Sequence, residues 1–250
     1  HLMNREDGEL ISARAADLLI ACDRSNAPRF TAFLTEGECA LAQQTLDRLH
    51  GSFAFFGGYA QAQRRILCVH PPEYAPEEQA YPIACVHLTY RRVDNLTHRD
   101  VLGALMHLRL RRDAIGDILP QEGLTQVFLH KPVAQLVCDE LRKIGRVGIR
   151  AELAAYTGSF VQEFEPIEGT VPSLRLDAVV SLAARISREK SAVLIHGGQV
   201  TVGGLPVLTP SALIGQDAVF SARGFGKFRL AQVSGITKKG RLHITIEKFM

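Results

Sequence analysis

The 250-residue sequence has no paired-cysteine motif. Its five cysteines are scattered, and none of them forms a Cys-x-x-Cys pair. Structural zinc sites usually take their ligands from such pairs, so the spacing argues against a zinc ribbon. Scattered cysteines are typical of reduced thiols in a cytosol. We therefore expect no metal site and a cytoplasmic location.

Long apolar runs are also absent, although hydrophobic residues make up 46% of the chain. The longest runs are far shorter than the roughly 20 residues that a membrane-spanning helix needs. No charged start followed by an apolar stretch suggests a signal peptide, and His1 and Leu2 before Met3 are interpreted as a cloning remnant. We expect a globular chain with an ample core and no membrane partner.

Loops that bind nucleotide cofactors are missing as well. A Gly-Lys pair before Phe228 resembles the end of a phosphate-binding loop, but that loop needs Ser or Thr where Phe228 stands. A His-Arg-Asp triplet ending at Asp100 resembles a kinase catalytic loop, yet Leu105 replaces the Asn that must follow. Asp100 is better explained as an acid in the first turn of a helix, where the helix dipole favours a negative charge. We expect no cofactor, no catalytic residue and no enzymatic activity.

Positive charge is concentrated in the last third of the chain. The whole sequence has a formal net charge of +3, but residues 170–250 hold eleven Lys or Arg against four Asp or Glu, a net charge of +7. The first 169 residues hold 18 basic and 22 acidic side chains, a net charge of −4. Cations that lie close together bind a polyanion by releasing counterions from its phosphates. The asymmetry therefore indicates a polyanionic partner, with a solvated charged surface as the alternative.

Two short helices are predicted at the start of this basic region. Apolar residues from Leu176 to Ala183 recur at positions i, i+3, i+4 and i+7, the pattern of a helix with one buried face. Ser187 can cap a second helix by accepting hydrogen bonds from the free N–H groups of its first turn. Arg188 and Lys190 are expected to be exposed at the start of that helix, so the two helices should meet at a cationic corner.

Short strands and glycine turns are predicted to follow the helices. A strand at 199–202 and a strand at 205–208 are joined by a Gly-Gly pair, which suits a two-residue hairpin turn. A further strand is expected at 218–222, before a glycine-rich turn at 223–229 that carries three cations. We take nine candidate RNA-binding residues from this region: Arg175, Arg185, Ser187, Arg188, Lys190, Gln199, Arg223, Lys227 and Arg229.

The order of these features resembles the RNA-binding domain named after ribosomal small-subunit protein S-four, also called the alpha-L motif. The likeness rests on an Arg-Leu-Asp start at 175–177, a Ser-Arg pair at 187–188, a Gly-x-Val-x-Val strand at 198–202 and a Gly-x-Asp step at 215–217. The family usually has Asn-Gly at the hairpin where this chain has Gly203-Gly204. The resemblance implies that residues 170–250 form an S-four-type RNA-binding domain.

The preceding residues are predicted to form two more domains, so the expected fold class is α+β with an N-terminal α/β module (3–78), a middle domain (79–160) and the C-terminal domain (170–250). The middle segment reads strand, helix, strand, strand, helix, strand. This βαββαβ order is the ferredoxin-like or RNA-recognition-motif plait. The third predicted strand of the plait, 124–129, lacks the aromatic motif on which such domains stack bases, which leaves RNA binding by the sheet open. Residues 71–78 and 156–170 are predicted linkers.

Several motifs outside the basic region resemble the YlmH family of bacterial and plastid S-four-domain proteins, and the likeness covers nearly the whole chain. The motifs are Gly57-Gly58-Tyr59, Ala62-Gln63-Arg64-Arg65, the segment 98–118 and Thr237-Lys238-Lys239-Gly240-Arg241. The family typically has Ala-Glu-Arg where this chain has Ala62-Gln63-Arg64. The resemblance implies a bacterial RNA-binding protein that functions at the ribosome. Related small S-four proteins act on large subunits stalled with a peptidyl-tRNA, and the family's genes often lie near cell-division genes.

The favoured hypothesis is a non-enzymatic protein that binds structured rRNA or tRNA on the ribosome, with no DNA partner. The cations would neutralise phosphates, and Ser187 and Gln199 would offer hydrogen bonds to phosphate or 2′-hydroxyl groups. One alternative is an RNA-modifying enzyme, which would need a catalytic domain before residue 170. Another is a cell-division adaptor whose basic domain binds an acidic protein. Nuclease treatment of co-purifying partners distinguishes the adaptor from the RNA binder.

Overall fold

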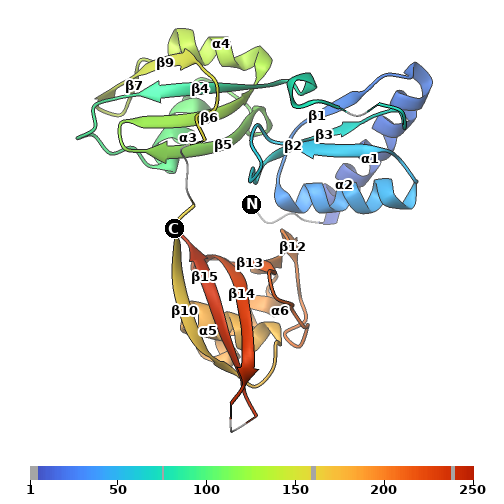
Figure 1. Cartoon of the computed structure of the whole chain (residues 1–250), viewed down its shortest axis with the longest axis vertical. Coiled ribbons are helices and arrows are strands. Elements are labelled where there is room, and N and C mark those ends of the chain that lie inside the picture. The colour runs from blue at the N-terminus through green and yellow to red at the C-terminus, as the bar shows by residue number, and fades with distance from the viewer. Residues whose placement is uncertain (1–4, 75, 159–161, 238–239) are drawn as a thin grey trace. The chain divides into compact units, whose positions relative to one another are not determined.

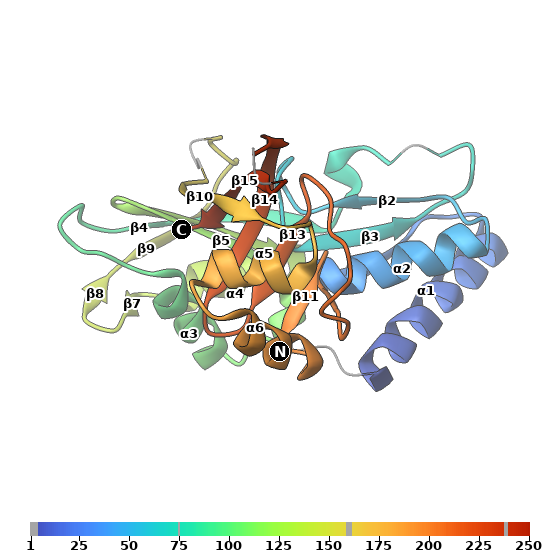
Figure 2. The same cartoon turned by 90° about the horizontal axis from the view of Figure 1, so that it is seen from below.

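The computed structural model describes residues 5–74, 76–158, 162–237 and 240–250 (Figures 1 and 2). The chain divides into two compact units: residues 9–160 form one, and residues 161–250 form the body of the other. The described residues include six α-helices, and all strand pairs between them are antiparallel. The mixed helix and sheet content agrees with the predicted fold class, whereas the division into three domains stays a prediction.

The first unit begins with a three-stranded sheet covered by two helices. The helices are α1 (Arg5–Ser25) and α2 (Glu36–Arg48), and the strands, in sheet order, are β1 (Arg29–Leu34), β3 (Arg65–Val69) and β2 (Phe53–Phe56). Apolar residues of both helices pack on one face of the sheet (Figure 2). Thr35 caps α2 in a capping box, because its Oγ1 accepts from the Glu38 N–H and the Glu38 carboxylate accepts from the Thr35 N–H. The sequence predicts this cap, because Thr35 stands directly before the helical pattern of residues 36–49, and the structure confirms both the cap and the helix.

A four-stranded sheet follows in the same unit, with its elements in the predicted order. They are β4 (Ile83–Thr89), α3 (His98–His107), β5 (Ile115–Gln121), β6 (Leu124–His130), α4 (Lys131–Glu140) and β9 (Arg150–Leu153). The strands lie in the order β5-β6-β4-β9, and α3 and α4 pack on one face. Two short 3-10 turns, η1 (Glu78–Ala80) and η2 (Arg112–Ala114), precede β4 and β5.

The end of α4 corrects the sequence prediction. The helix was expected to continue to Ile144 and to stop at Gly145, but it ends at Glu140. A two-stranded hairpin of β7 (Lys143–Ile144) and β8 (Val147–Gly148) takes the place of its last turn. Gly145 has φ +57°, a conformation that suits both a helix stop and a hairpin turn, and the pairing of Ile144 with Val147 makes it the hairpin turn.

A buried carboxylate joins the two sheets of the first unit. Asp117 on β5 accepts from the Tyr59 hydroxyl at 2.8 Å, from the Gln63 N–H at 2.7 Å and from the Arg64 N–H at 3.0 Å. Burial, followed by the nearby Asp117 charge, raises the pKa of Tyr59, so its hydroxyl stays a donor. The segment 57–65 is thereby held on the face of the four-stranded sheet that α3 and α4 leave uncovered.

The glycines of this segment allow it to lie close against the four-stranded sheet. Gly58 has φ +102°, and a Cβ atom there would lie 2.2 Å from the Phe128 ring. The Tyr59 ring stacks on Phe128, with 5.1 Å between ring centroids. The short motifs at 57–59, 62–65 and 115–118 therefore meet in one joint whose contacts are structural.

The second unit is a six-stranded sheet with two helices on one face (Figure 1). Its elements are β10 (Phe164–Val171), α5 (Leu176–Ala184), α6 (Arg188–His196), β11 (Val200–Val202), β12 (Leu205–Pro206), β13 (Val219–Ala222), β14 (Gly226–Ile236) and β15 (Leu242–Phe249). The strand order is β10-β15-β14-β13-β11-β12. The predicted helices and the strand at 218–222 are confirmed, whereas the strand predicted at 205–208 ends at Pro206.

Strand β10 shows that the second predicted linker is wrong over residues 164–170. All eight residues of β10 pair with β15. Pro166 and Gly169, which suggested a linker, are tolerated because β10 is an edge strand and does not need every backbone N–H in the ladder. Gly169 also gives room to Leu182 of α5, whose side chain would lie 2.6 Å from a Cβ at that position.

Asp117→Ala is expected to lower the free energy of unfolding of the first unit by about 3–5 kcal/mol, because three donors lose their acceptor in a buried place. Asp113→Ala is the matched control, since Asp113 lies on the same segment but pairs with an exposed Arg111. The measurement is urea unfolding followed by circular dichroism. Equal losses of stability in the two variants would show that Asp117 does not hold the joint.

Candidate nucleic-acid interface

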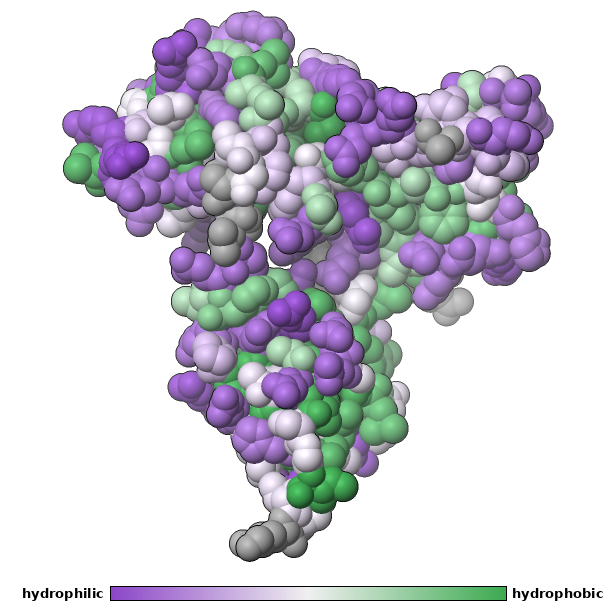
Figure 3. All heavy atoms as spheres, viewed as in Figure 1, coloured by the Kyte–Doolittle hydropathy of each residue, from purple (hydrophilic) through white to green (hydrophobic). Residues whose placement is uncertain are grey.

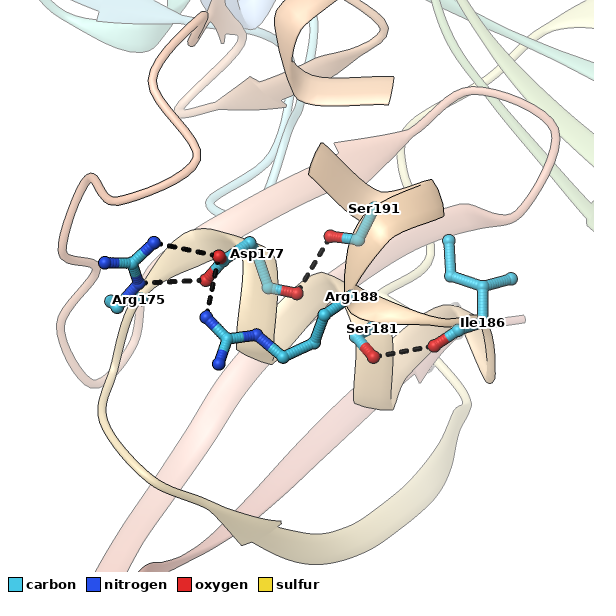
Figure 4. Close-up of polar contacts among 6 residues, drawn as sticks. All are labelled: Arg175, Asp177, Ser181, Ile186, Arg188 and Ser191. Carbon is cyan, nitrogen blue, oxygen red and sulfur yellow. Dashed lines mark hydrogen bonds and ion pairs between the residues drawn. The ribbon is translucent and has the colours of Figure 1, made fainter. Parts of the chain in front are cut away.

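One acid organises the cations at the start of the second unit. Asp177 lies in the first turn of α5, and its side chain is 8% exposed. Its carboxylate accepts from Arg175 Nε at 3.2 Å and Nη2 at 3.0 Å, and from Arg188 Nη2 at 2.7 Å (Figure 4). Burial alone would raise the pKa of Asp177, but the hydrogen bonds and charges of the two arginines hold it below its ordinary value. An ionised carboxylate therefore positions two guanidinium groups.

The corner between α5 and α6 is fixed by two further hydrogen bonds (Figure 4). Ser191 donates to the Asp177 carbonyl at 2.8 Å, and Ser181 donates to the Ile186 carbonyl at 2.6 Å. Arg185 ends α5 in the left-handed conformation, with φ 53°. These contacts hold the first turn of α6 against α5, so the cations near the corner belong to a rigid element.

Ser187 is the N-cap of α6, as predicted. Its Oγ accepts from the Lys190 N–H at 3.1 Å. A hydroxyl also has a donor hydrogen, which the cap does not use. Ser187 can therefore hold the helix start and still donate a hydrogen bond to a phosphate oxygen.

Arg188 is exposed, as predicted, but it is also bonded to Asp177, which the sequence did not predict. Its side chain is 48% exposed, and Arg175 is 40% exposed with the same partner. Lys190, on the same helix turn, is exposed as predicted. Each guanidinium has five N–H donors, so Arg175 and Arg188 keep donors for a phosphate while Asp177 fixes their position.

Two of the predicted cations lie on the other face of the sheet. Phe228 and Leu230 of β14 point into the core with α5, so their neighbours Lys227 and Arg229 face away from it. Arg229 pairs with Glu247 and lies over the Phe164 ring, 5.0 Å from its centroid. Lys227 lies 5.2 Å from the centroid of Phe249. This open face of the sheet combines cations with rings and with an acid.

Gln199 and Arg223 lie at the end of the sheet, and Arg185 lies in the turn between α5 and α6. The Arg223 N–H donates to the Gln199 carbonyl at 2.9 Å, which brings these two residues together, and the Arg223 side chain is exposed. Arg185 is 76% exposed and lies 3.9 Å from Glu165. Arg185 also lines a hollow of about 220 Å³ with Gly224 of the β13–β14 turn.

The structure thus brings five of the nine candidates together at the corner of α5 and α6. The other four lie in the turns and on the open face of the sheet. Lys238 and Lys239, which contribute to the basic charge and to the terminal motif, lie outside the described residues. We call the first group the helix-corner surface: Arg175, Arg185, Ser187, Arg188 and Lys190.

Sequence reasoning missed the role of Asp177 and Glu247. Glu247 was treated only as a charge, and Asp177 only as a charge and as part of the motif at 175–177. Each is bonded to a cation that was proposed to bind RNA. A signal for Asp177 was present, because an acid in the first turn of a helix next to arginines is placed to pair with them. Glu247 had no such signal, since it is 18 residues from Arg229 and only the β14–β15 pairing brings them together.

Other kinds of site find little support in the described part of the chain. No three His, Cys, Asp or Glu residues there cluster in a way that could hold a metal ion. No described helix is both long and apolar enough to cross a membrane.

Comparison with known proteins finds similar proteins both in sequence and in structure. A family model described as "Putative RNA-binding domain in YlmH" matches residues 76–158. "Ribosome-associated protein quality control protein P2" of Bacillus subtilis (strain 168) is 31% identical over 223 residues, which cover 88% of this chain and 87% of the relative. The solved structure "Cell division protein ylmH from Streptococcus pneumoniae" is similar in fold, with a TM-score of 0.55 and 22% identity over 63% of this chain and 96% of that one.

Arg188→Glu should lower the free energy of unfolding of the second unit by about 1–3 kcal/mol, because it removes a charge-assisted bond and places a second carboxylate beside Asp177. Lys190→Glu, two residues along the same helix, should change it by less than about 0.5 kcal/mol. Urea unfolding of the two variants measures the difference. If Arg188→Glu is as stable as Lys190→Glu, the Asp177 pairing contributes nothing to the fold.

A pH titration tests the same contact. The lowered pKa of Asp177 means that the unfolded state binds a proton first, so this contribution to stability is complete above the ordinary value of 3.8 and is lost as the pH falls through the folded pKa. Between about pH 5 and pH 3 the wild type should lose more stability than Asp177→Asn, which cannot titrate. Parallel stability curves for the two proteins over this range would contradict the assignment.

Proposed function

This chain belongs to the YlmH family, and we propose that it is a non-enzymatic protein that binds structured ribosomal or transfer RNA on the ribosome. The observation that carries the proposal is the helix-corner surface, where Asp177 holds Arg175 and Arg188 beside the exposed Lys190. Arginines fixed in this way suit phosphate oxygens, which they can bind through two N–H groups at once.

The second unit is, in this proposal, an S-four-type RNA-binding domain. Support comes from its helix pair, its glycine turns and the Ser-Arg pair at 187–188, which opens α6 at the same corner. The four-stranded sheet of the first unit is proposed to be a ferredoxin-like plait. Its strand order β5-β6-β4-β9 and its crossover helices support this, and so does the family model that matches residues 76–158.

The place of binding is proposed to be the large ribosomal subunit, in the quality control of stalled ribosomes. The name of the Bacillus subtilis relative, which is similar over most of both chains, supports this part of the proposal. It also supports a cytoplasmic location. No described feature favours the alternatives of an RNA-modifying enzyme or a cell-division adaptor.

The helix-corner surface is a better candidate than the open face of the sheet. Arg229 on the open face is tied to Glu247, so its charge is already neutralised. At the corner Lys190 is exposed, Arg185 is 76% exposed with Glu165 no closer than 3.9 Å, and Asp177 neutralises only part of the charge. The corner therefore has the larger surplus of positive charge for a phosphate backbone.

Salt dependence of binding to purified large subunits tests the proposal. About four engaged corner cations should contribute about −3 to −4 to the slope of log affinity against log salt, since each phosphate contact contributes about 0.7 to 0.9. Lys190→Glu should flatten the slope by about one, whereas Lys227→Glu on the open face should leave it unchanged. If Lys227→Glu flattened the slope and Lys190→Glu did not, the interface would lie on the open face of the sheet. A slope near zero would show that phosphate contacts do not drive binding.

A further inference from the structure

The sheet face through which a plait of this kind usually binds RNA is covered in this protein. RNA-recognition motifs stack bases on aromatic residues of the face opposite their helices. The aromatic residue in that place here is Phe128 on β6, and its side chain is 1% exposed. Tyr59 of the same chain stacks on it, with an interplanar angle of 20°. A ring of the protein thus takes the position that a base would occupy.

The residues that cover this face are held in place by contacts within the first unit. Tyr59 is bonded to Asp117, and Tyr156 packs against both Tyr59 and Phe128. Gln126, the next β6 residue on this face, is fully buried and accepts from the Thr157 N–H at 3.0 Å. Opening this face would break the joint between the two sheets. RNA that binds this part of the chain must therefore use another surface.

A basic cleft lies on the opposite, helical side of the same sheet. It has a volume of about 910 Å³ and lies between α3 and the segment from the end of α4 through the β7–β8 hairpin. Figure 2 shows α3 beside β7 and β8, and in Figure 3 hydrophilic residues gather at the β7 end of this sheet. The walls of the cleft, α3 and the β7–β8 hairpin, thus take no part in covering the other face of the sheet.

The lining of the cleft favours a polyanion. Arg99 comes from α3, and Arg142, Lys143 and Arg146 come from the opposite wall; all four side chains are exposed. The acids of the lining are Asp100 and Glu140, and Asp100 is already bonded to Thr97 in the capping box of α3. Its volume is in the range of small-molecule pockets, but four of the six charged side chains in its lining are cations.

Local structure fixes these cations in place. Arg142 donates to the Cys138 carbonyl at 2.9 Å, which ties it to the last turn of α4. The positive φ of Gly145 allows the tight turn that carries Lys143 and Arg146 on one hairpin. The buried Leu141 and Ile144 anchor this segment in the core beneath the cleft. Cations on a short, anchored hairpin lose little freedom when they bind a phosphate.

We propose that this cleft binds the phosphate backbone of RNA and is a second RNA-binding surface, separate from the helix-corner surface. The inference rests on the proposed function, that the chain binds RNA. Three of the four cations are arginines, which can bind a phosphate through two N–H groups at once. The cleft also lies within the residues that the family model matches.

The test uses the full chain and two labelled probes, a short single-stranded uridine oligonucleotide and an RNA duplex of the same length. The variants are Arg99→Glu on one wall and the pair Lys143→Glu with Arg146→Glu on the other. At about 0.1 M salt each cation removed should weaken binding of the preferred probe about five-fold. Arg14→Glu, on an exposed position of α1, is the control and should bind as the wild type does. Thermal unfolding checks that each variant is folded.

The same variants in a Lys190→Glu background separate this inference from the proposed function. If the cleft and the helix corner both bind RNA, the losses multiply. If only Lys190→Glu weakens binding, the cleft proposal is overturned and the proposed function stands. If only the cleft variants weaken it, the helix-corner assignment fails and the cleft stands. Cleft variants that bind RNA normally but lose binding to polyglutamate would identify an acidic protein as the partner and overturn the RNA assignment.

Discussion

A carboxylate taken out of water must be compensated by hydrogen bonds. Each unit of this protein is arranged around one buried carboxylate that has such hydrogen bonds. Asp117 receives three donors from the segment that covers the four-stranded sheet, and Asp177 receives two arginines and lies at the corner of two helices. An ion left unpaired in such places costs several kcal/mol, so neither contact is optional once the chain is compact. The donors come from different elements, and each carboxylate therefore fixes how those elements meet.

The two carboxylates have different consequences for function. Asp117 holds a cover over the sheet face that a plait would otherwise offer to RNA, so it closes a surface. Asp177 holds two guanidinium groups in fixed positions at the protein surface, so it orders a surface that can bind phosphate. Its negative charge lowers the net charge there, but fixed donors need less ordering when a phosphate arrives. Formal charge along the sequence therefore overstates the number of free cations and understates how well the remaining ones are placed.

Sequence reasoning worked best where one local rule decides the structure. The periodicity from Leu176 to Ala183 placed α5, and caps at Thr35 and Ser187 placed the starts of α2 and α6. It failed where a distant partner decides: Pro166 and Gly169 resemble a linker until β15 pairs with them, and the end of α4 depends on the β7–β8 hairpin. The same distinction holds for the residues of the candidate site. The helix-corner residues were found together because they are close in sequence, whereas the neutralisation of Arg229 by Glu247 depends on a pairing across the sheet.

The two proposed RNA surfaces lie on different compact units of one chain, and this has an energetic consequence. Once one surface is bound, binding of the other is intramolecular and proceeds at an effective concentration that short connections place in the millimolar range. Neither surface then needs high affinity of its own. Four phosphate contacts contribute only about 3 log units at 0.1 M salt, a weak interaction by itself. Two such surfaces on one RNA give a binding that is tight while both are engaged, although each surface alone can dissociate easily.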